Sequence, residues 1–582
     1  MWNKVRLSSL AVLFLDLGLV IFLIYDFGFK DYQDLRQYKL IVLPTLVLAL
    51  ILFNLYKYRL FKRQRKSNIS PKINLYYLSL LVIVEVVTII SDFKISLFDS
   101  FFNVRYVIEY GLLFYFFIRI SFLVRKIYAI YFNPAILFVG SFAIIALGGT
   151  FLLMLPASTT HSISFIDALF TAISATSVTG LIVVDTAKDF TSFGQTVIMV
   201  VFQLGGLGML TFTSFFAYFF KTGSSFRESL YMKDIMGNND ELGGIMKRVM
   251  QVVAFSLLVE ALGAVLIYTS LPNSDTIPNQ GFFAVFHAVS AYCNAGFSLE
   301  SMGLYDINLR FNYYLQWILM ALIIFGGLGY HIAFNVIQYV KRFITNLFRS
   351  KNKIFISRVI LLNTKIVLYT SALLIVCGTG FFLISEQHTN LVEHTTWFGK
   401  LTTSLFSSVT ARTAGFNTVD YANFSIPGIL FMIFLMWIGA SPASTGGGIK
   451  TTTFAIATLN VFFVAKDQPY IEIGTRRIAA QSVRRAFAIM AISLASIGTG
   501  ILFLLIFNPE FSLLQIAFEV FSAFSTVGVS MGITASLSDL SKLVLILLMF
   551  LGRIGLLNLM IGLLKNVSQA DYSYPEENIL IN

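Results

Sequence analysis

Cysteine is almost absent from this sequence: Cys293 and Cys377 are the only two among 582 residues. Two cysteines in apolar or small-residue stretches build neither a disulfide framework nor a cysteine-rich metal site. Charge is also scarce, at 12% of residues, whereas 57% are hydrophobic and the mean hydropathy is +0.78. This composition excludes an ordinary soluble protein and indicates an all-α polytopic membrane protein.

Catalytic motifs are missing as well. The sequence has no H-E-x-x-H motif and no nucleophile with a base at suitable spacing. These absences argue against the alternative from a different functional class, a polytopic membrane enzyme such as an intramembrane protease or transferase. We therefore expect no enzymatic activity and no cofactor in this chain.

Apolar runs of about 20 residues, the length that crosses a bilayer, recur twelve times along the chain. The net charge of +12 comes from basic residues between these runs, most densely at 57–72. By the positive-inside rule this cluster is cytoplasmic, which predicts cytoplasmic termini in a cell inner membrane or plasma membrane. Topology and contact with lipid headgroups account for the charge, so we expect a lipid bilayer and no nucleic acid as partner.

Four segments share one shape, namely FTAISATSVTGL, FHAVSAYCNAGF, LFSSVTARTAGF and VFSAFSTVGV. Each contains one glycine at an equivalent place, spaced by 113 to 119 residues, and each is followed by a second motif: GGLG, GGLG, GGIK or GRIG. The sequence therefore predicts four copies of one unit. The predicted regions are an additional N-terminal four-helix transmembrane region (1–130), pore repeats at 133–225, 246–345, 357–465 and 484–566, and a cytoplasmic tail (567–582).

Each unit reads as a spanning helix, a short helix, a glycine-centred turn and a second spanning helix. The short helices, for instance 166–175 and 514–523, cannot cross a bilayer of about 30 Å, so they re-enter and stop partway. Non-helical backbone at membrane depth persists only where it is buried in protein or lines a water-filled cavity. Four such turns, arranged as membrane-pore-membrane repeats with pseudo-fourfold symmetry, predict one central pore.

A pore of this kind selects ions with backbone oxygens. A ring of carbonyls from four loops replaces the water of a dehydrated monovalent cation, and glycine allows the backbone angles that turn carbonyls inward. The C-terminal ends of the short helices also favour a cation. A single glycine of this type is more often a helix-packing site, and only the fourfold recurrence favours a filter. The predicted filter residues are Val178, Thr179, Gly180, Asn294, Ala295, Gly296, Thr413, Ala414, Gly415, Thr526, Val527 and Gly528.

These segments, together with SPASTGGGIKTT at 441–452, resemble the Trk, Ktr and HKT superfamily of potassium transporters, most closely the membrane subunit of bacterial Ktr systems. The resemblance covers about residues 133–566. It implies potassium uptake through one central filter by a homodimer that sits on a separate cytosolic nucleotide-binding ring of RCK type. Glycine at all four filter positions implies potassium as the transported ion. A sodium-conducting member of the same family is the alternative, and the loops leave open whether sodium stimulates uptake.

A gate is predicted below the filter. Proline removes a helix hydrogen bond and three successive glycines disfavour a helix, so the third repeat has a loop inside the membrane rather than a simple proline kink. The resemblance implies that the loop gates the pore. The candidate gate residues are Ser441, Pro442, Ala443, Ser444, Thr445, Gly446, Gly447 and Gly448, with Lys450 and Arg553.

Arg553 stands where the other repeats have glycine, within an otherwise apolar run. A charge at that depth costs about 2.5 to 3.5 kcal/mol on insertion scales and marks a functional site. Arg553 either impedes cations and tethers the loop, or pairs with a carboxylate such as Glu260. Lys450 is a comparable charge in the third repeat.

Other polar residues receive local roles. Asp185 and Asp420 each follow a filter glycine by five residues, where they either concentrate cations or serve as solvated loop carboxylates. His287 has no acid or second histidine at ligand spacing, so we expect a hydrogen-bonded packing role.

Overall fold

The computed structural model describes residues 134–208, 245–271, 277, 279–348, 360–442 and 444–555, with scattered positions between 14 and 59. Of the predicted N-terminal region, 1–130, only those scattered positions are described. The predicted tail (567–582) and the candidate gate residue Ala443 lie outside the described residues.

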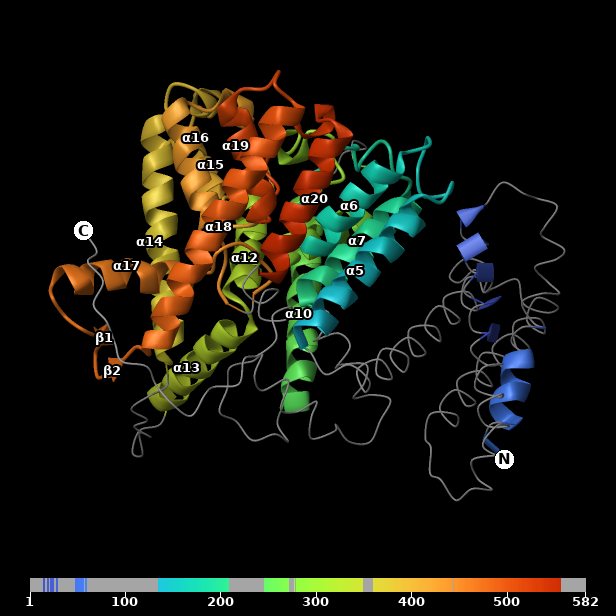
Figure 1. Cartoon of the computed structure of the whole chain (residues 1–582), viewed down its shortest axis with the longest axis horizontal. Coiled ribbons are helices and arrows are strands. Elements are labelled where there is room, and N and C mark those ends of the chain that lie inside the picture. Colours follow the sequence, from blue (N-terminus) through green and yellow to red (C-terminus); the bar gives the residue numbers. More distant parts are fainter. Residues whose placement is uncertain are drawn as a thin grey trace, which may run out of the picture.

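The described part is almost entirely helical, and its helices follow the predicted repeats (Figure 1). The first two repeats contain α5 (Pro134–Leu153), α6 (Phe165–Ser177), α7 (Ser192–Leu207), α10 (Ile245–Ser270), α11 (Gln280–Cys293), α12 (Tyr313–Leu328) and α13 (Tyr330–Phe348). The last two contain α14 (Leu362–Ser385), α15 (Trp397–Thr410), α16 (Ile426–Trp437), α17 (Thr451–Ala465), α18 (Ala480–Phe507), α19 (Leu513–Phe524) and α20 (Asp539–Ile554). Four 3₁₀ turns lie in loops: η3 (Gly303–Tyr305), η4 (Asn390–Glu393), η5 (Tyr421–Asn423) and η6 (Thr534–Ser536).

One small sheet departs from the all-α expectation. Strand β1 (Glu472–Ile473) pairs antiparallel with β2 (Arg476–Arg477), with Glu472 opposite Arg477. Gly474, at φ 62°, supplies the positive φ that this tight connection needs. The hairpin lies between α17 and α18, near the lower end of the helices in Figure 1.

The four short helices predicted before the glycines are α6, α11, α15 and α19, of 12 to 14 residues each. Each begins at a side chain that accepts a hydrogen bond from the backbone N–H three residues on. The four capping residues are Ser164, Asn279, Thr396 and Ser512. Ser512 and Gln515 complete a reciprocal capping box, so the start of these helices is fixed by local sequence.

Three described helical segments are long and apolar enough to span a bilayer alone: Met250–Ser270, Leu362–Ser385 and Ala480–Phe507. The apolar run at 312–340 was predicted as one span, and this is wrong. The chain bends by 104° between Tyr313–Leu328 and Tyr330–Asn346. The break falls at Gly329, whose φ of 76° ends α12 in a conformation that a helix cannot continue.

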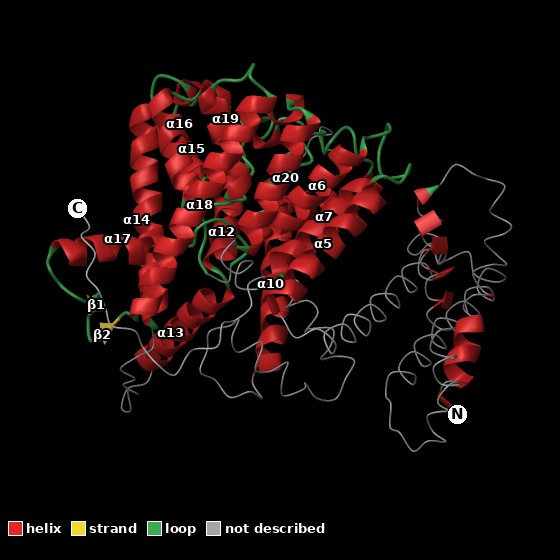
Figure 2. Cartoon of the chain, in the orientation of Figure 1, coloured by secondary structure: helices red, strands yellow, loops and turns green. Residues whose placement is uncertain are grey.

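The units pack in cyclic order. In every case the second helix of one unit packs against the short helix of the next: α7 on α11, α12 on α15, α16 on α19, and α20 on α6. The last contact closes the ring between residues nearly 400 positions apart in sequence. Figure 2 shows that many of the loops gather at the upper end of these helices.

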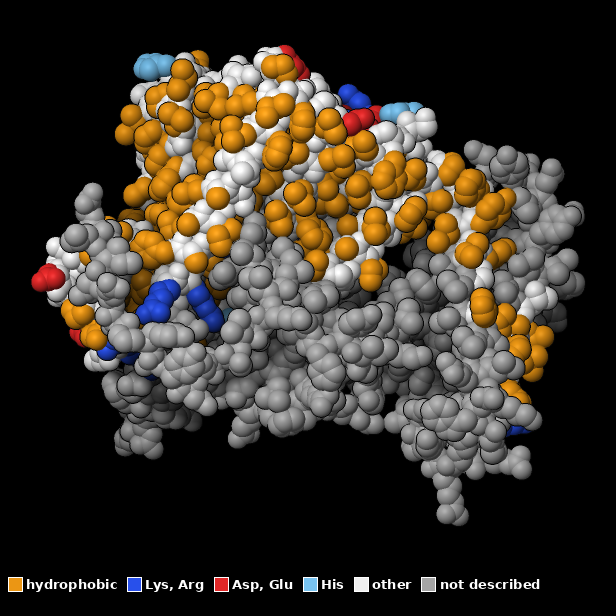
Figure 3. All heavy atoms as spheres, viewed as in Figure 1, with side chains coloured by type: hydrophobic (Ala, Val, Ile, Leu, Met, Phe, Trp, Pro, Cys, Tyr) orange, Lys and Arg blue, Asp and Glu red, His pale blue; other side chains and the backbone are white. Residues whose placement is uncertain are grey.

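The flank of this helical body is apolar, as expected in contact with lipid (Figure 3). Large exposed hydrophobic side chains lie along α10, α14 and α18, among them Val265, Tyr369 and Ile506. In Figure 3 the visible acidic and histidine side chains gather mainly at the upper rim, and most visible lysines and arginines lie toward the lower end. The protein is thus a helical membrane protein by both composition and surface.

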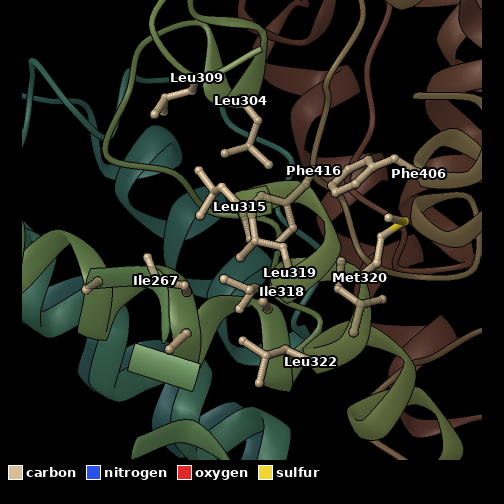
Figure 4. Close-up of a cluster of buried hydrophobic side chains, with 14 of the residues drawn as sticks. Ile267, Leu304, Leu309, Leu315, Ile318, Leu319, Met320, Leu322, Phe406 and Phe416 are labelled. Atoms are coloured by element: carbon tan, nitrogen blue, oxygen red, sulfur yellow. The ribbon is translucent and has the colours of Figure 1, made fainter. Parts of the chain in front are cut away.

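Buried clusters join neighbouring units. Figure 4 shows Leu315 and Leu319 of α12 around Phe416, the residue after the third predicted filter glycine, with Phe406 of α15 nearby. All four side chains are at most 1% exposed. Since burying a large apolar side chain contributes about 1.5–3 kcal/mol, this cluster fixes the third loop against the second unit.

Polar contacts reinforce the joints at the upper end. Lys542 of α20 pairs with Asp167 of α6 at 2.7 Å, and Arg310 pairs with Glu393 at 3.0 Å. His394, which is 2% exposed, bridges two units: its Nδ1 lies 2.9 Å from the Tyr313 hydroxyl. Its Nε2 lies 3.2 Å from Oγ1 of Thr403 in α15.

His394 makes this joint sensitive to acid. Burial lowers the pKa of His394 from its ordinary 6.5, opposed by Glu393 and assisted by Arg310 and Lys400. As pH falls below 6.5 the unfolded chain takes up this proton before the folded protein does, so stability is lost. We expect the thermal midpoint to fall by a few degrees more between pH 7.5 and 5 in the wild type than in His394→Gln. Equal falls would contradict this assignment.

Candidate functional site

The short helices all end in the same kind of loop. In each loop two residues separated by one position have positive φ, and the second is the predicted filter glycine. The four pairs are Val178 (58°) with Gly180 (88°), Asn294 (61°) with Gly296 (70°), Thr413 (75°) with Gly415 (82°), and Thr526 (52°) with Gly528 (93°). Positive φ is costly for a non-glycine residue, and such strain concentrates at functional sites.

The four glycines meet one another. A side-chain carbon added to any of them would collide with the carbonyl oxygen of the residue before the glycine in the next loop. The pairs are Gly180 with Ala295, Gly296 with Ala414, Gly415 with Val527, and Gly528 with Thr179. The series returns to its start, so the loops form a closed ring around one centre. Only glycine fits this approach.

Carbonyl oxygens in this ring have no hydrogen-bond donor. Eleven of the twelve predicted filter residues are buried, and Gly296 is half-buried. Within the described ranges, none of their twelve carbonyl oxygens accepts a hydrogen bond. More than nine in ten buried backbone groups in proteins are paired. Twelve free carbonyls in one buried ring are therefore a site for a ligand that accepts oxygen lone pairs, which is a cation.

The N–H groups of these loops point the opposite way, toward the short helices. The N–H before each glycine donates to a helix carbonyl at 2.7 to 3.0 Å: Thr179 to Ser174, Ala295 to Ser290, Ala414 to Thr410, and Val527 to Ser522. Alternating positive and negative φ turns successive N–H groups to one side and leaves the carbonyls on the other. The helices thus hold the loops from behind.

Hydroxyl groups complete this support, and sequence reasoning missed the ones that matter. Side chains five or six residues before the glycine bond the loop backbone: Ser174 to Leu181 O (2.7 Å), Ser290 to Phe297 O (2.9 Å), Thr410 to Phe416 O (2.7 Å), and Ser522 from Gly528 N (3.1 Å). The hydroxyls expected to do so lie within the loop itself, such as Ser177, which instead donates to Ile173 O. The recurrent hydroxyl at one offset was the available signal.

Glycines of the second motif act in close packing. A side-chain carbon at Gly205, Gly326 or Gly552 would overlap the carbonyl oxygen of Thr176, Tyr292 or Phe524 respectively, each four residues before a filter glycine. The second helix of three units therefore touches the backbone of its own short helix. Packing through small residues, considered above for the filter glycines, describes this second motif instead.

In the third unit a loop replaces this contact. Helix α16 ends at Trp437 and α17 begins at Thr451, and Gly439 N donates to Ile449 O at 2.8 Å across the base of the loop. The loop contacts three of the four filter segments. Carbon atoms added at Gly446 and Gly447 would overlap Thr413 Oγ1 and Thr526 Oγ1, and Thr445 Oγ1 donates to Tyr292 O at 3.4 Å. The loop therefore lies directly against the inner ends of the filter segments.

Arg553 and Lys450 hold this loop. The Arg553 guanidinium donates to Thr445 O in the loop and, at 2.6 Å, to Gly205 O at the end of α7. Lys450 Nζ donates to Gly446 O at 2.5 Å. Arg553 has no carboxylate within ion-pair distance among the described residues. The alternative pairing of Arg553 with Glu260 is wrong, because Glu260 is engaged elsewhere.

Glu260 belongs to a buried chain of contacts behind the second loop. Both of its carboxylate oxygens accept from Gln203 Nε2, at 3.0 and 2.9 Å, and Gln203 Oε1 accepts from the Cys293 thiol at 3.1 Å. Cys293 ends α11, directly before Asn294. This chain links the first and second units next to the ring.

The upper mouth of the ring is acidic, but its carboxylates serve the loops. Asp185 accepts from Ala187 N at 2.8 Å, and Asp420 accepts from Ala422 N at 3.0 Å. Burial raises the pKa of Glu300, and the charges of Asp306 and Asp185 raise it further. Over the described ranges, no group of three or more His, Cys, Asp or Glu side chains is placed to hold a metal ion. The solvated-loop account of Asp185 and Asp420 thus has direct contacts behind it.

Comparisons with known proteins agree on one family. The family model described as "TrkH: Cation transport protein" matches residues 126–573. The potassium/sodium uptake protein NtpJ of Enterococcus hirae is 36% identical, over 77% of this chain and 97% of that protein. The Ktr system potassium uptake proteins B of Vibrio alginolyticus and Bacillus subtilis are each 36% identical. They cover 76% and 77% of this chain, and 93% and 96% of their own lengths.

A solved structure has the same fold. The potassium transporter TrkH from Vibrio parahaemolyticus aligns with a TM-score of 0.59 over 85% of this chain and 98% of its own. The sequence identity is only 16%, so this likeness concerns the fold alone.

Proposed function

The chain belongs to the TrkH family of cation transport proteins, and on that premise we propose that it takes up potassium through a single filter at the ring of four glycine loops. The observation that carries this proposal is the closed ring of buried carbonyls without hydrogen-bond donors. The relatives named for potassium uptake extend over nearly their whole length along this chain.

In this proposal the ion exchanges its hydration shell for backbone oxygens. Each loop contributes carbonyls of three residues, so an ion at the axis is surrounded by oxygens from all four units. The C-terminal ends of α6, α11, α15 and α19 add their negative dipole ends near the ring. No fixed charge is needed in the path, so the ion binds firmly enough to enter and weakly enough to leave. The four-repeat organisation with a pseudo-fourfold axis is part of the proposal, and the cyclic packing of the units supports it.

The gate in this proposal is the loop from Ser441 to Gly448, with Lys450 and Arg553. The contacts of Gly446 and Gly447 with the inner ends of two filter segments favour a loop that obstructs the path. Arg553 adds a positive charge at the same level, which repels cations, and binds the loop carbonyl of Thr445. Opening then requires the loop to leave these contacts.

Assembly and orientation follow the family resemblance. We propose a homodimer in the cell membrane with cytoplasmic termini, regulated by a separate cytosolic nucleotide-binding ring of RCK type. Relatives named as parts of a Ktr system support a transporter of more than one component. Isolation of the protein from its native membrane, followed by identification of the co-purified chains, tests this.

Flux measurements test the function. In proteoliposomes containing the purified protein, we expect rubidium uptake that potassium competes away and that sodium competes far less effectively. The name of the Enterococcus relative includes sodium as well as potassium, so a sodium-conducting transporter is the second candidate. Flux carried mainly by sodium would replace the first proposal with the second.

A further inference from the structure

The position nine residues before the filter glycine differs between units. It is occupied by Thr171, His287, Phe406 and Glu519 in the four units, in chain order. The position two residues after the glycine is occupied by Ile182, Ser298, Asn417 and Ser530. In the second and fourth units the two positions are joined by a side-chain hydrogen bond, and the fourth unit does this with a buried carboxylate.

Glu519 is fully buried, with an exposed fraction of 0%. Its Oε1 accepts from the Ser530 hydroxyl at 2.5 Å and from Met531 N at 3.0 Å. Its Oε2 accepts from the Thr534 hydroxyl at 2.9 Å. One side chain of α19 thus binds three donors on the segment that leaves the filter. This set of contacts is called the Glu519 clamp below.

His287 makes the matching contact in the second unit. Its Nε2 lies 3.0 Å from Ser298 Oγ and its Nδ1 lies 2.9 Å from Phe283 O in its own helix. The ring is fully buried and also packs near Phe416 of the third loop, at 6.3 Å between centroids. The expected packing role is confirmed, and it includes a hydrogen bond to the segment after the filter.

The first and third units lack this link. The Thr171 hydroxyl donates to Asp167 O at 2.9 Å, within its own helix. Phe406 offers no polar atom, and Asn417 donates instead to Met302 O at 3.1 Å. Because the loops follow one another around the ring in chain order, the second and fourth units face each other across it. The clamped loops are therefore one diagonal pair.

From this geometry we infer that Glu519 is a positioning residue for the filter, and this inference rests on the proposed function. Met531 is three residues after Gly528, and its N–H is fixed to the carboxylate. The backbone from Gly528 to Met531 cannot turn without breaking that bond, so the clamp holds the carbonyls at this end of the filter in place. Removal of a buried acceptor leaves three donors unsatisfied, which frees the segment to rearrange.

Three variants test the inference through the potassium-to-sodium preference of flux in proteoliposomes. Glu519→Ala removes both acceptor oxygens and is expected to lower the preference about tenfold, as expected for loss of a buried hydrogen-bonded group. Glu519→Gln keeps one oxygen for Ser530 and Met531, and its amide can donate to the Thr534 hydroxyl, so it is expected to restore most of the preference. Thr171→Val is the matched control at the equivalent position of the first unit and is expected to keep the wild-type ratio.

Ser530→Ala provides an independent measurement if Glu519→Ala does not fold, because Ser530 is only half-buried. It removes one donor of the clamp and is expected to shift the preference in the same direction by a smaller factor. Wild-type ratios in both Glu519→Ala and Ser530→Ala would overturn the inference. So would a ratio in Glu519→Gln as low as in Glu519→Ala, since positioning needs the oxygen and not the charge. Absence of potassium-competed flux in the wild type would instead refute the proposed function.

Discussion

Replacement of Gly180 by serine is expected to remove most of the preference for potassium over sodium. Gly180 has φ 88°, and an added side-chain carbon would overlap Ala295 O and lie 3.0 Å from Gly296 Cα. The serine must either rotate the peptide or push the second loop away, and both displace carbonyls that the larger ion needs. Strain of about 1–3 kcal/mol at such a position corresponds to roughly a 5- to 150-fold change in an equilibrium.

The measurement is the ratio of rubidium to sodium flux at matched protein content. Gly148→Ser is the control, because Gly148 lies in α5 of the same unit with nothing within 4 Å of an added carbon. Folding of both variants is expected to be preserved, with the Gly180 variant alone losing selectivity. An unchanged ratio in Gly180→Ser would remove the filter assignment, because the four loops would then not determine which ion passes.

Replacement of Arg553 by alanine is expected to raise potassium flux. The change removes a positive charge from the path and two hydrogen bonds, to Thr445 O and to Gly205 O, that hold the loop. Hydrogen bonds from a charged group contribute about 1.5–3 kcal/mol each. Loss of even one shifts a closed-to-open equilibrium by roughly tenfold or more. Initial rates of rubidium uptake measure the effect.

Arg553→Lys separates the charge from the tether. Lysine keeps the charge, but a single ammonium is less able to reach the two carbonyls that the guanidinium fork bridges. We therefore expect a flux between those of the wild type and Arg553→Ala. Equal or lower flux in Arg553→Ala, at normal expression, would show that this residue is no barrier.

These two variants address different levels of one pathway. Gly180 lies in the ring that chooses the ion, whereas Arg553 binds the loop beneath it. Selectivity is thus expected to change without a rise in maximal flux in the first case, and flux to change with little loss of selectivity in the second. If each variant altered both properties equally, the separation of filter and gate would be wrong.

Local pattern was enough to find the elements that build the site. The helices predicted at 166–175 and 514–523 are α6 and α19, because capping residues and short apolar runs define their ends. The break at 441–448 also follows from composition, since proline and consecutive glycines disfavour a helix. The bend at Gly329 was missed because an apolar run looks the same whether its helix is continuous or broken.

What the sequence by itself determined is the repeated unit: four short helices, four glycines with equivalent spacing, and a membrane-compatible composition. Periodicity records contacts between near neighbours in the chain, so it predicts elements but not their partners. Only the tertiary structure decided that Gly528 meets Thr179, that Arg553 binds Thr445 and Gly205 rather than Glu260, and that hydroxyls such as Ser174 hold the loops. The physical reason is that the inter-unit contacts join segments brought together by packing around a ring, and no local preference specifies which distant oxygen a donor will meet.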